Sequence, residues 1–148
     1  MSYVESLYHA VIRTKYNKRA LSLDHSNELY RYIWGIMKNR KCVLYRVNGM
    51  EDHVHILFTL HPNIAIADFM RDLKVETSKM LKRTPGFEQF TSWSKGYAAL
   101  MCDINNKDVV VNYIKNQREH HKKVSLREEY VMYLKEKRME LDERDWAE

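Results

Sequence analysis

Residues 51–60 contain the pattern that most constrains the fold of this chain. The segment reads Glu-Asp-His-Val-His-Ile-Leu-Phe-Thr-Leu, and as a strand it would point alternate side chains to opposite faces. One face is apolar and needs a hydrophobic core; its residues are Val54, Ile56, Phe58 and Leu60. The other face presents His53 and His55 side by side, a spacing suited to holding one ion between two imidazoles. Two histidines on a strand are nevertheless more often ordinary half-exposed residues than metal ligands.

Length and composition limit the class of protein. The chain has 148 residues, of which 45% are hydrophobic and 30% charged, so it can form one domain with a proper core, and disorder is excluded. No apolar run approaches the length of a membrane span, and the first residues lack a signal-peptide pattern, so we expect a cytoplasmic protein. Cys42 and Cys102 lie in apolar segments without metal-type spacing and are expected to be free, buried thiols.

The formal net charge of +5 favours an anionic partner, although many basic proteins bind none. Basic residues near helix ends are also explained by the helix dipole, which favours positive charge at the C-terminus. Two clusters of basic residues lie beside segments that carry candidate functional residues. These candidate DNA-binding residues are Lys15, Lys18, Arg19, Lys115, Arg118 and Lys122.

The hydrophobic periodicities predict an order of elements. Strands are expected at residues 7–14, 42–47, 51–60 and 97–102, and helices at 26–39 and from 62 to about 85. Asn48-Gly49 is a strong hairpin signal between the second and third strands. The order strand, helix, strand, strand, helix, strand is typical of the ferredoxin-like, split βαβ arrangement. We therefore expect an α+β fold with an antiparallel sheet and both helices on one face.

Two further helices are expected after the last strand. Asn105 and Asp108 form a capping-box pattern before a helix through residue 121, which carries Tyr113 and Gln117 on one stripe. From periodicity alone, Tyr113 is more simply a core residue. Ser125 and Glu128 open a final amphipathic helix, whose apolar side is expected to hold Tyr130, Val131, Leu134 and Leu141. We expect a single domain, 1–148, with a catalytic core at 1–123 and a C-terminal helical tail at 124–148.

Three separated motifs occur together: Asp-His-Val-His-Ile-Leu at 52–57, Trp-Ser-Lys-Gly-Tyr at 93–97, and Val-Val-Val-Asn-Tyr-Ile-Lys-Asn-Gln-Arg-Glu-His-His at 109–121. With them the chain resembles the single-tyrosine HUH transposases of the IS200/IS605 group, which includes the REP-associated tyrosine transposases. The resemblance implies that His53 and His55 are metal ligands, that Gln117 is the third ligand, and that Tyr113 is the nucleophile. It also implies a homodimer with composite sites, although the sequence leaves open whether each site is built in one chain or across two.

The chemistry of these residue types agrees with what the resemblance implies. A tyrosine that attacks a phosphodiester stores the bond energy as an ester, so cleavage can be reversed without ATP. A phenol with a pKa near ~10 is a poor nucleophile at neutral pH, so a divalent ion is needed at the phosphate. Two imidazoles and an amide oxygen leave positions open and suit Mg²⁺ or Mn²⁺.

The resemblance therefore implies a DNA transposase that cleaves and rejoins single-stranded DNA at hairpin-marked element ends through a 5′-phosphotyrosine. Two alternatives are a domesticated relative that processes repeated extragenic hairpins and a DNA-hairpin-binding protein that does not cleave. The chain has Met50-Glu51-Asp52 where the family often has Pro-Asp, which should alter only the turn. His120 and His121 are expected to contact phosphate or to be solvated, and are not assigned to the metal.

Overall fold

The sheet has the predicted ferredoxin-like topology. The structure, a computed structural model, describes residues 2–148. The elements of the split βαβ unit are β1 (Leu7–Arg13), α1 (Ser26–Asn39), β2 (Val43–Gly49), β3 (His53–Thr59), α2 (Ile66–Arg83) and β4 (Ala98–Met101), with a short 3-10 turn η1 (Lys15–Asn17) after β1. The strand order is β2-β3-β1-β4 and each neighbouring pair is antiparallel, which confirms the expected α+β fold.

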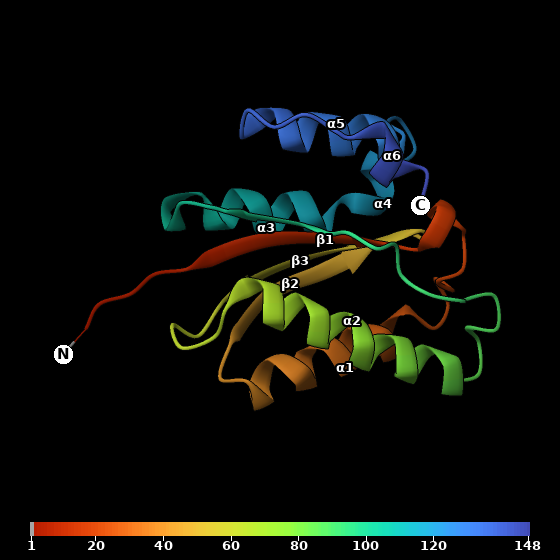
Figure 1. The fold of residues 1–148 in the computed structure, drawn as a ribbon, viewed down its shortest axis with the longest axis horizontal. Coiled ribbons are helices and arrows are strands. Elements are labelled where there is room, and N and C mark those ends of the chain that lie inside the picture. Colours follow the sequence, from red (N-terminus) through yellow and green to blue (C-terminus); the bar gives the residue numbers. More distant parts are fainter. Residues whose placement is uncertain (1) are drawn as a thin grey trace.

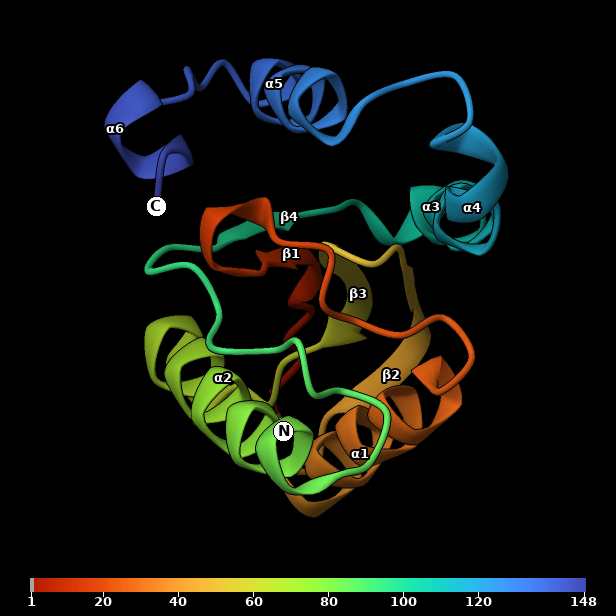
Figure 2. The ribbon, with the colours of Figure 1, turned by 90° about the vertical axis from the view of Figure 1, so that its right-hand side faces the viewer.

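Helices cover both faces of this sheet. The helices α1 and α2 lie on one face, as expected, and the C-terminal helices lie on the other (Figures 1 and 2). The main hydrophobic core lies between the sheet and the first helix pair, and it contains Val54, Ile56, Phe58 and Leu60 of the alternating segment. Because strand side chains alternate, His53 and His55 must then point to the other face, under the C-terminal helices.

The elements on that second face are η2 (Ile104–Asn106), α3 (Lys107–Lys115), α4 (Gln117–His120), α5 (Leu126–Glu136) and α6 (Glu143–Trp146). Two small hydrophobic clusters attach them to the sheet. Ile114 of α3 packs against Leu7 and Leu57, and Tyr130 of α5 packs against Val11 and Ala98. Within residues 2–148, none of the helices combines the length and the apolar character that crossing a membrane requires.

The sequence predicted that Asn48-Gly49 forms the turn between β2 and β3, and this prediction is wrong. Strand β2 continues through both residues, which pair with His55 and Val54, and the chain reverses at residues 50–52. The Asn48 side chain instead donates from Nδ2 to the carbonyl oxygens of Ile114 and Lys115, at 3.0 and 3.2 Å. A Cβ on Gly49 would lie 2.1 Å from the His53 carbonyl oxygen, so the glycine permits close approach of the two strands.

The helix expected to run through residue 121 is interrupted. Asn116 leaves helical geometry, with φ −95° and ψ 16°, and it separates α3 from α4 at the point where Asn48 contacts the two α3 carbonyls. The capping box at Asn105 and Asp108 is also wrong. Asp103 accepts a hydrogen bond from the Asn105 amide and caps η2, and the N-cap residue of α3 makes no side-chain cap bond.

The tail begins as predicted and ends differently. Ser125 Oγ accepts from the Glu128 amide at 3.2 Å and caps α5, which confirms the second capping pattern. The helix stops at Glu136, however, and a separate α6 follows. Leu134, Leu141 and Trp146 pack around Tyr130. Val131 is 37% exposed and does not belong to this apolar side. The two cysteines are free, and Cys42 is buried whereas Cys102 is only partly buried.

Candidate active site

Strand β3 holds His53 and His55 beneath the C-terminal helices, where both are almost completely buried. Each ring is fixed by a partner on one of its two nitrogens. His53 Nδ1 lies 2.8 Å from Asp52 Oδ1, and His55 Nδ1 lies 2.8 Å from Nε2 of His9 on β1. The Nε2 atoms of both rings are therefore turned into the space between the sheet and the helices, because a contact at Nδ1 sets the direction of Nε2.

The α3–α4 segment places Tyr113 and Gln117 in that same space. Gln117 is fully buried, and its Oε1 lies 3.0 Å from His53 Nε2. The Tyr113 hydroxyl donates to the carboxylate of Glu129, and the Gln117 amide donates to the same carboxylate oxygen at 2.7 Å. The structure thus gathers the four residues proposed for catalysis and metal binding within one hydrogen-bonded cluster.

Glu129, on α5, is the residue at the centre of the cluster, and the sequence patterns did not identify it. Its Oε1 lies 2.9 Å from His55 Nε2, 3.0 Å from His121 Nε2 and 3.5 Å from His53 Nε2. The only available signal was a carboxylate next to the apolar stripe of the last helix. The His121 side chain is 6% exposed, so the expectation of a solvated residue is wrong for it, whereas His120 is 30% exposed.

The protonation of the cluster follows from burial and from these contacts. Burial disfavours the charged ring of His53, but hydrogen bonds with Asp52 and Glu129 outweigh it and raise its pKa to about 9. For His55, burial dominates and lowers the pKa to about 4. Burial and the Glu129 contact together hold the pKa of Tyr113 above its usual value. Tyr113 is therefore a protonated donor in this arrangement, and it needs nearby positive charge to ionise.

Burial would raise the pKa of Glu129, but the hydrogen bonds from His121, His53 and His55 hold it well below its usual range. The carboxylate is thus an anion enclosed by imidazole rings. A buried anion of this kind is stable only where it is paired with positive charge or bound to a cation.

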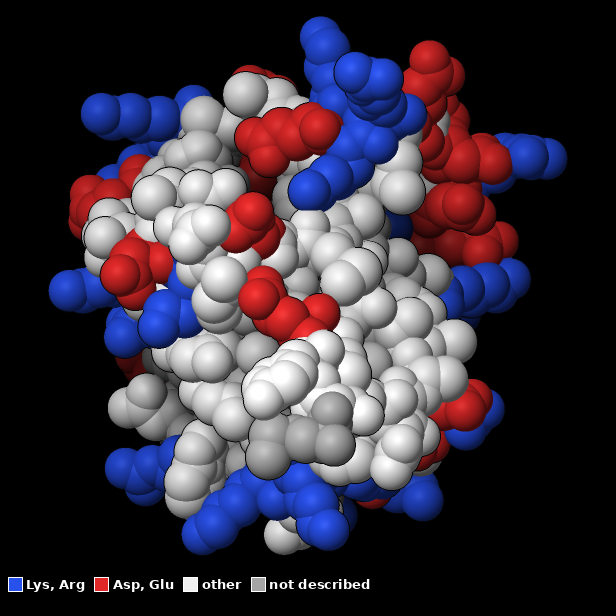
Figure 3. Space-filling model, turned by 90° about the vertical axis from the view of Figure 1, so that its left-hand side faces the viewer, with Lys and Arg blue, Asp and Glu red and all other residues white. Residues whose placement is uncertain are grey.

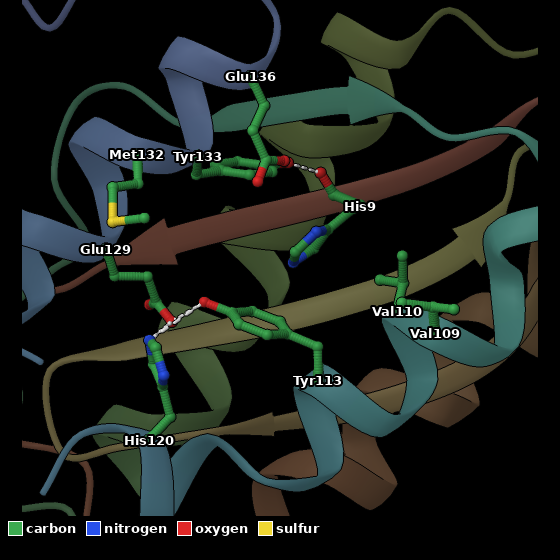
Figure 4. A pocket seen from close by; sticks show the side chains of 9 residues that line it. All are labelled: His9, Val109, Val110, Tyr113, His120, Glu129, Met132, Tyr133 and Glu136. Atoms are coloured by element: carbon green, nitrogen blue, oxygen red, sulfur yellow. Dashed lines mark hydrogen bonds and ion pairs between the residues drawn. The ribbon is translucent and has the colours of Figure 1, made fainter. Parts of the chain in front are cut away.

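Two cavities flank the cluster. One, of about 250 Å³, lies between α3 and α5 against the Tyr113 ring (Figure 4), and its walls include His9, Val109, Val110, Met132, Tyr133 and Glu136. Figure 4 shows the Tyr113 hydroxyl directed at Glu129 at one side of this cavity. The second, of about 300 Å³, lies on the other side, where Arg19, Asp52, His121 and Arg127 line it. Reactants can therefore approach the cluster from two directions.

Of the six predicted DNA-binding residues, Arg19 lines the second cavity, and the others belong to separate segments. Lys15 belongs to η1, Lys18 and Arg19 follow it, Lys115 ends α3, and Arg118 and Lys122 lie in or after α4. Both η1 and α4 lie at the right-hand end of the molecule in Figure 1. Two of these side chains already have partners, since Lys122 pairs with Glu119 at 2.9 Å and Arg118 donates to Ser26 Oγ at 2.9 Å.

The opposite end of the molecule has a different character. Figure 3 shows basic and acidic side chains interspersed there, with a broad uncharged area between them. Long-range attraction of an anion depends on a surface of one sign. This end therefore lacks the single-sign surface that would attract a phosphate backbone from a distance.

The donor atoms of the cluster fit a divalent cation. His53, His55, His121 and Glu129 each offer one ligand atom, and these four atoms lie within 4.8 Å of one another. Imidazole nitrogens and a carboxylate oxygen are ordinary ligands of divalent metal ions in proteins. The contacts from Asp52 and His9 complete the pattern, because they hold Nδ1 of each ring and direct its Nε2 atom into the cluster.

Curated proteins with similar sequences are transposases. The chain is 26% identical over 117 residues to the ISDra2 transposase TnpA of Deinococcus radiodurans, an alignment that covers 76% of this chain and 84% of that protein. It is 29% identical over 120 residues to the transposase for insertion sequence element IS200 of Salmonella typhimurium, which covers 78% of each.

Solved structures resemble the fold as well. A transposase crystal structure from Deinococcus radiodurans R1 superposes with a TM-score of 0.59 and 26% identity, covering 79% of this chain and 95% of that chain. A REP-associated tyrosine transposase bound to a REP hairpin superposes with a TM-score of 0.61 at 14% identity, covering 84% and 73%. The family model described as "Transposase IS200 like" matches residues 2–117. The matched residues include the sheet, the strand that carries the two histidines and the helix that carries Tyr113. The chain therefore belongs to the IS200-like transposase family.

Proposed function

We propose that this transposase is a metal-dependent strand transferase that cleaves and rejoins single-stranded DNA at hairpin-marked element ends, with Tyr113 as its nucleophile. One observation supports this most directly: the Tyr113 hydroxyl and the Gln117 amide bond the same carboxylate, which also contacts His53 and His55. A phenol and a set of metal-type ligands therefore converge on one carboxylate.

The reaction forms one bond to phosphorus and breaks another. Tyr113 Oη attacks the scissile phosphorus and gives up its proton to solvent, and the bond from phosphorus to the 3′ oxygen breaks. The departing 3′ oxygen takes up a proton, so the products are a 5′-phosphotyrosine and a free 3′-OH. Attack of another 3′-OH on the phosphotyrosine reverses these steps, releases Tyr113 and joins the strands.

His53 and His55 would hold the cation through Nε2, and Gln117 would contribute Oε1, which lies 3.0 Å from His53 Nε2. When bound, Mg²⁺ or Mn²⁺ neutralises the scissile phosphate and favours the ionised phenol. Asp52 and His9 keep the two rings oriented. Burial and the neighbouring Glu129 carboxylate raise the pKa of Tyr113, so the phenol needs a nearby cation to ionise.

The proposed substrate is a DNA hairpin with an adjoining single strand. The solved relative bound to a REP hairpin supports this class of substrate. Lys15, Lys18, Arg19, Lys115, Arg118 and Lys122 are the proposed backbone contacts. Such contacts set affinity without reading sequence, and they make binding salt-dependent. The apolar walls of the 250 Å³ cavity beside Tyr113 can receive an unpaired base next to the cleaved bond.

The composite-site homodimer implied by the resemblance stays a prediction. Within a single chain, Tyr113 and Gln117 already contact groups that contact the same chain's histidines. The contacts thus favour a site built in one chain.

The deciding experiment is Tyr113→Phe, assayed with a labelled hairpin oligonucleotide and Mn²⁺. The variant should bind the oligonucleotide as wild type does, but it should give neither cleavage nor a denaturation-resistant adduct, because the attacking oxygen is gone. Tyr97→Phe is the matched control, since Tyr97 lies beside β4 outside the cluster, and this variant should cleave normally. An adduct formed by the Tyr113→Phe protein would refute the assignment. Absence of cleavage by the wild type would favour the non-cleaving, hairpin-binding alternative.

A further inference from the structure

Two residues in the centre of the site come from a part of the chain that the family model does not match. The match ends at residue 117, whereas His121 follows α4 and Glu129 lies on α5. Both side chains are nevertheless buried in the cluster, at 6% and 4% exposure. The C-terminal tail therefore supplies donor atoms to a site whose other members belong to the matched core.

We infer that His121 and Glu129 are ligands of the divalent cation together with His53 and His55, so that the tail completes the metal site. The inference rests on the proposed function and deepens it. It assigns the carboxylate ligand to α5, and it gives Gln117 an additional task beside the one proposed above.

The distances around Glu129 support a ligand set. Three imidazole Nε2 atoms lie 2.9, 3.0 and 3.5 Å from Glu129 Oε1. Metal bonds of about 2.0–2.2 Å place neighbouring ligand atoms roughly 3–3.5 Å apart, so the distance of each nitrogen from Glu129 Oε1 is close to that between two ligands of one ion. The three nitrogens come from two separate parts of the chain, β3 and the segment after α4, and they converge on one oxygen.

In three of the proposed ligands, the atom that does not face the ion is held by another group, as is usual in metal sites. His53 Nδ1 is held by Asp52, and His55 Nδ1 by His9. On Glu129, Tyr113 and Gln117 both donate to Oε2 and leave Oε1 turned to the histidines. The additional task of Gln117 is thus to position this carboxylate. Contacts of this kind fix the direction of a ligand's lone pair.

The composition of the set predicts the preferred ion. Three imidazoles and one carboxylate suit Mn²⁺ and the later divalent transition metals, whereas Mg²⁺ prefers oxygen ligands and retains water. We therefore expect Mn²⁺ to bind much more tightly than Mg²⁺. We also expect bound Mn²⁺ to fasten α5 to the sheet, because one of its residues would be a ligand.

The test measures Mn²⁺ binding to the full chain, from the electron paramagnetic resonance signal of free Mn²⁺ during titration of metal-free protein. Glu129→Gln and His121→Gln should each weaken Mn²⁺ binding by at least about tenfold, since removing even a residue that only orients a ligand lowers metal affinity by about that factor. Glu128→Gln makes the same charge change one residue away, on the exposed side of α5, and should bind as wild type does. Mg²⁺ should compete poorly for the site.

Hydrogen exchange gives a readout that does not depend on any variant folding well. Addition of Mn²⁺ to the wild type should slow amide exchange across residues 126–136, and the effect should be absent in Glu129→Gln. If Mn²⁺ leaves exchange in this segment unchanged, or if both variants bind as tightly as wild type while His53→Ala does not, the tail is no part of the metal site. Unchanged binding by His53→Ala as well would overturn the metal site of the proposed function itself.

Discussion

Asn48→Ala is expected to loosen the junction that places Tyr113 and Gln117 in the site. Asn48 lies on β2 and is 9% exposed, and its amide donates to the carbonyl oxygens of Ile114 and Lys115. These carbonyls lie at the end of α3, directly before the break at Asn116. Alanine removes the donor and leaves both carbonyl oxygens without this side-chain partner.

The size of the effect follows from the two lost hydrogen bonds. At about 0.5–1.5 kcal/mol for each, the free energy of unfolding should fall by about 1–3 kcal/mol. For a chain of this length that corresponds to a decrease in Tm of about 3–10 °C. Cleavage should suffer more than stability, because a displacement of about 1 Å at a reacting group can cost roughly 100-fold in rate.

The measurements are thermal unfolding and the rate of hairpin cleavage, with two companion variants. Asn48→Asp retains the size of the side chain but has no amide donor, so it should lose activity as Asn48→Ala does. Asn112→Ala makes the same substitution at an exposed position of α3 and should raise stability slightly, since alanine favours helices. If Asn48→Ala unfolds and cleaves as wild type does, the side chain does not hold the α3–α4 junction.

Three other outcomes follow from the site. Gly49→Ala places a Cβ 2.1 Å from the His53 carbonyl oxygen, so it should lower stability by about 1–3 kcal/mol and weaken Mn²⁺ binding; unchanged denaturation and titration curves would contradict the close approach. Asp52→Ala frees the His53 ring and should weaken Mn²⁺ binding about 10- to 100-fold in the same titration, and equal affinity would rule out the orienting role. Mixing a His53→Ala/His55→Ala chain with a Tyr113→Phe chain should restore no cleavage if each site is built in one chain, whereas recovery would show exchange of the tyrosine helix between subunits.

The local periodicity of the chain was enough to predict the sheet and the face on which the histidines lie. The period of two in residues 53–60 places Val54, Ile56 and Phe58 in the main core, so His53 and His55 have to lie on the opposite side. The order of strands and helices then restricts the topology to few choices, and the ferredoxin-like arrangement is one in which both helices cover one face.

Local patterns failed where a side chain bonds something distant in sequence. Asn48-Gly49 has the composition of a hairpin turn, but Asn48 bonds carbonyls 66 and 67 residues further along, and β2 continues through it. The same contact lies at the interruption of the expected helix before Gln117. Turn and helix propensities describe what a segment does alone, and packing between segments overrides them.

The identities of Tyr113, His53, His55 and Gln117 as candidates came from motifs, whereas the residue that connects them came only from the fold. Glu129 is 74 residues from His55 and 16 from Tyr113, and no spacing along the chain relates them. The tail lies over β1 and β4 because Tyr130 packs on Val11 and Ala98, and this packing carries the neighbouring Glu129 into the cluster. The burial of an apolar helix face, a tertiary effect, thus decided where the carboxylate lies.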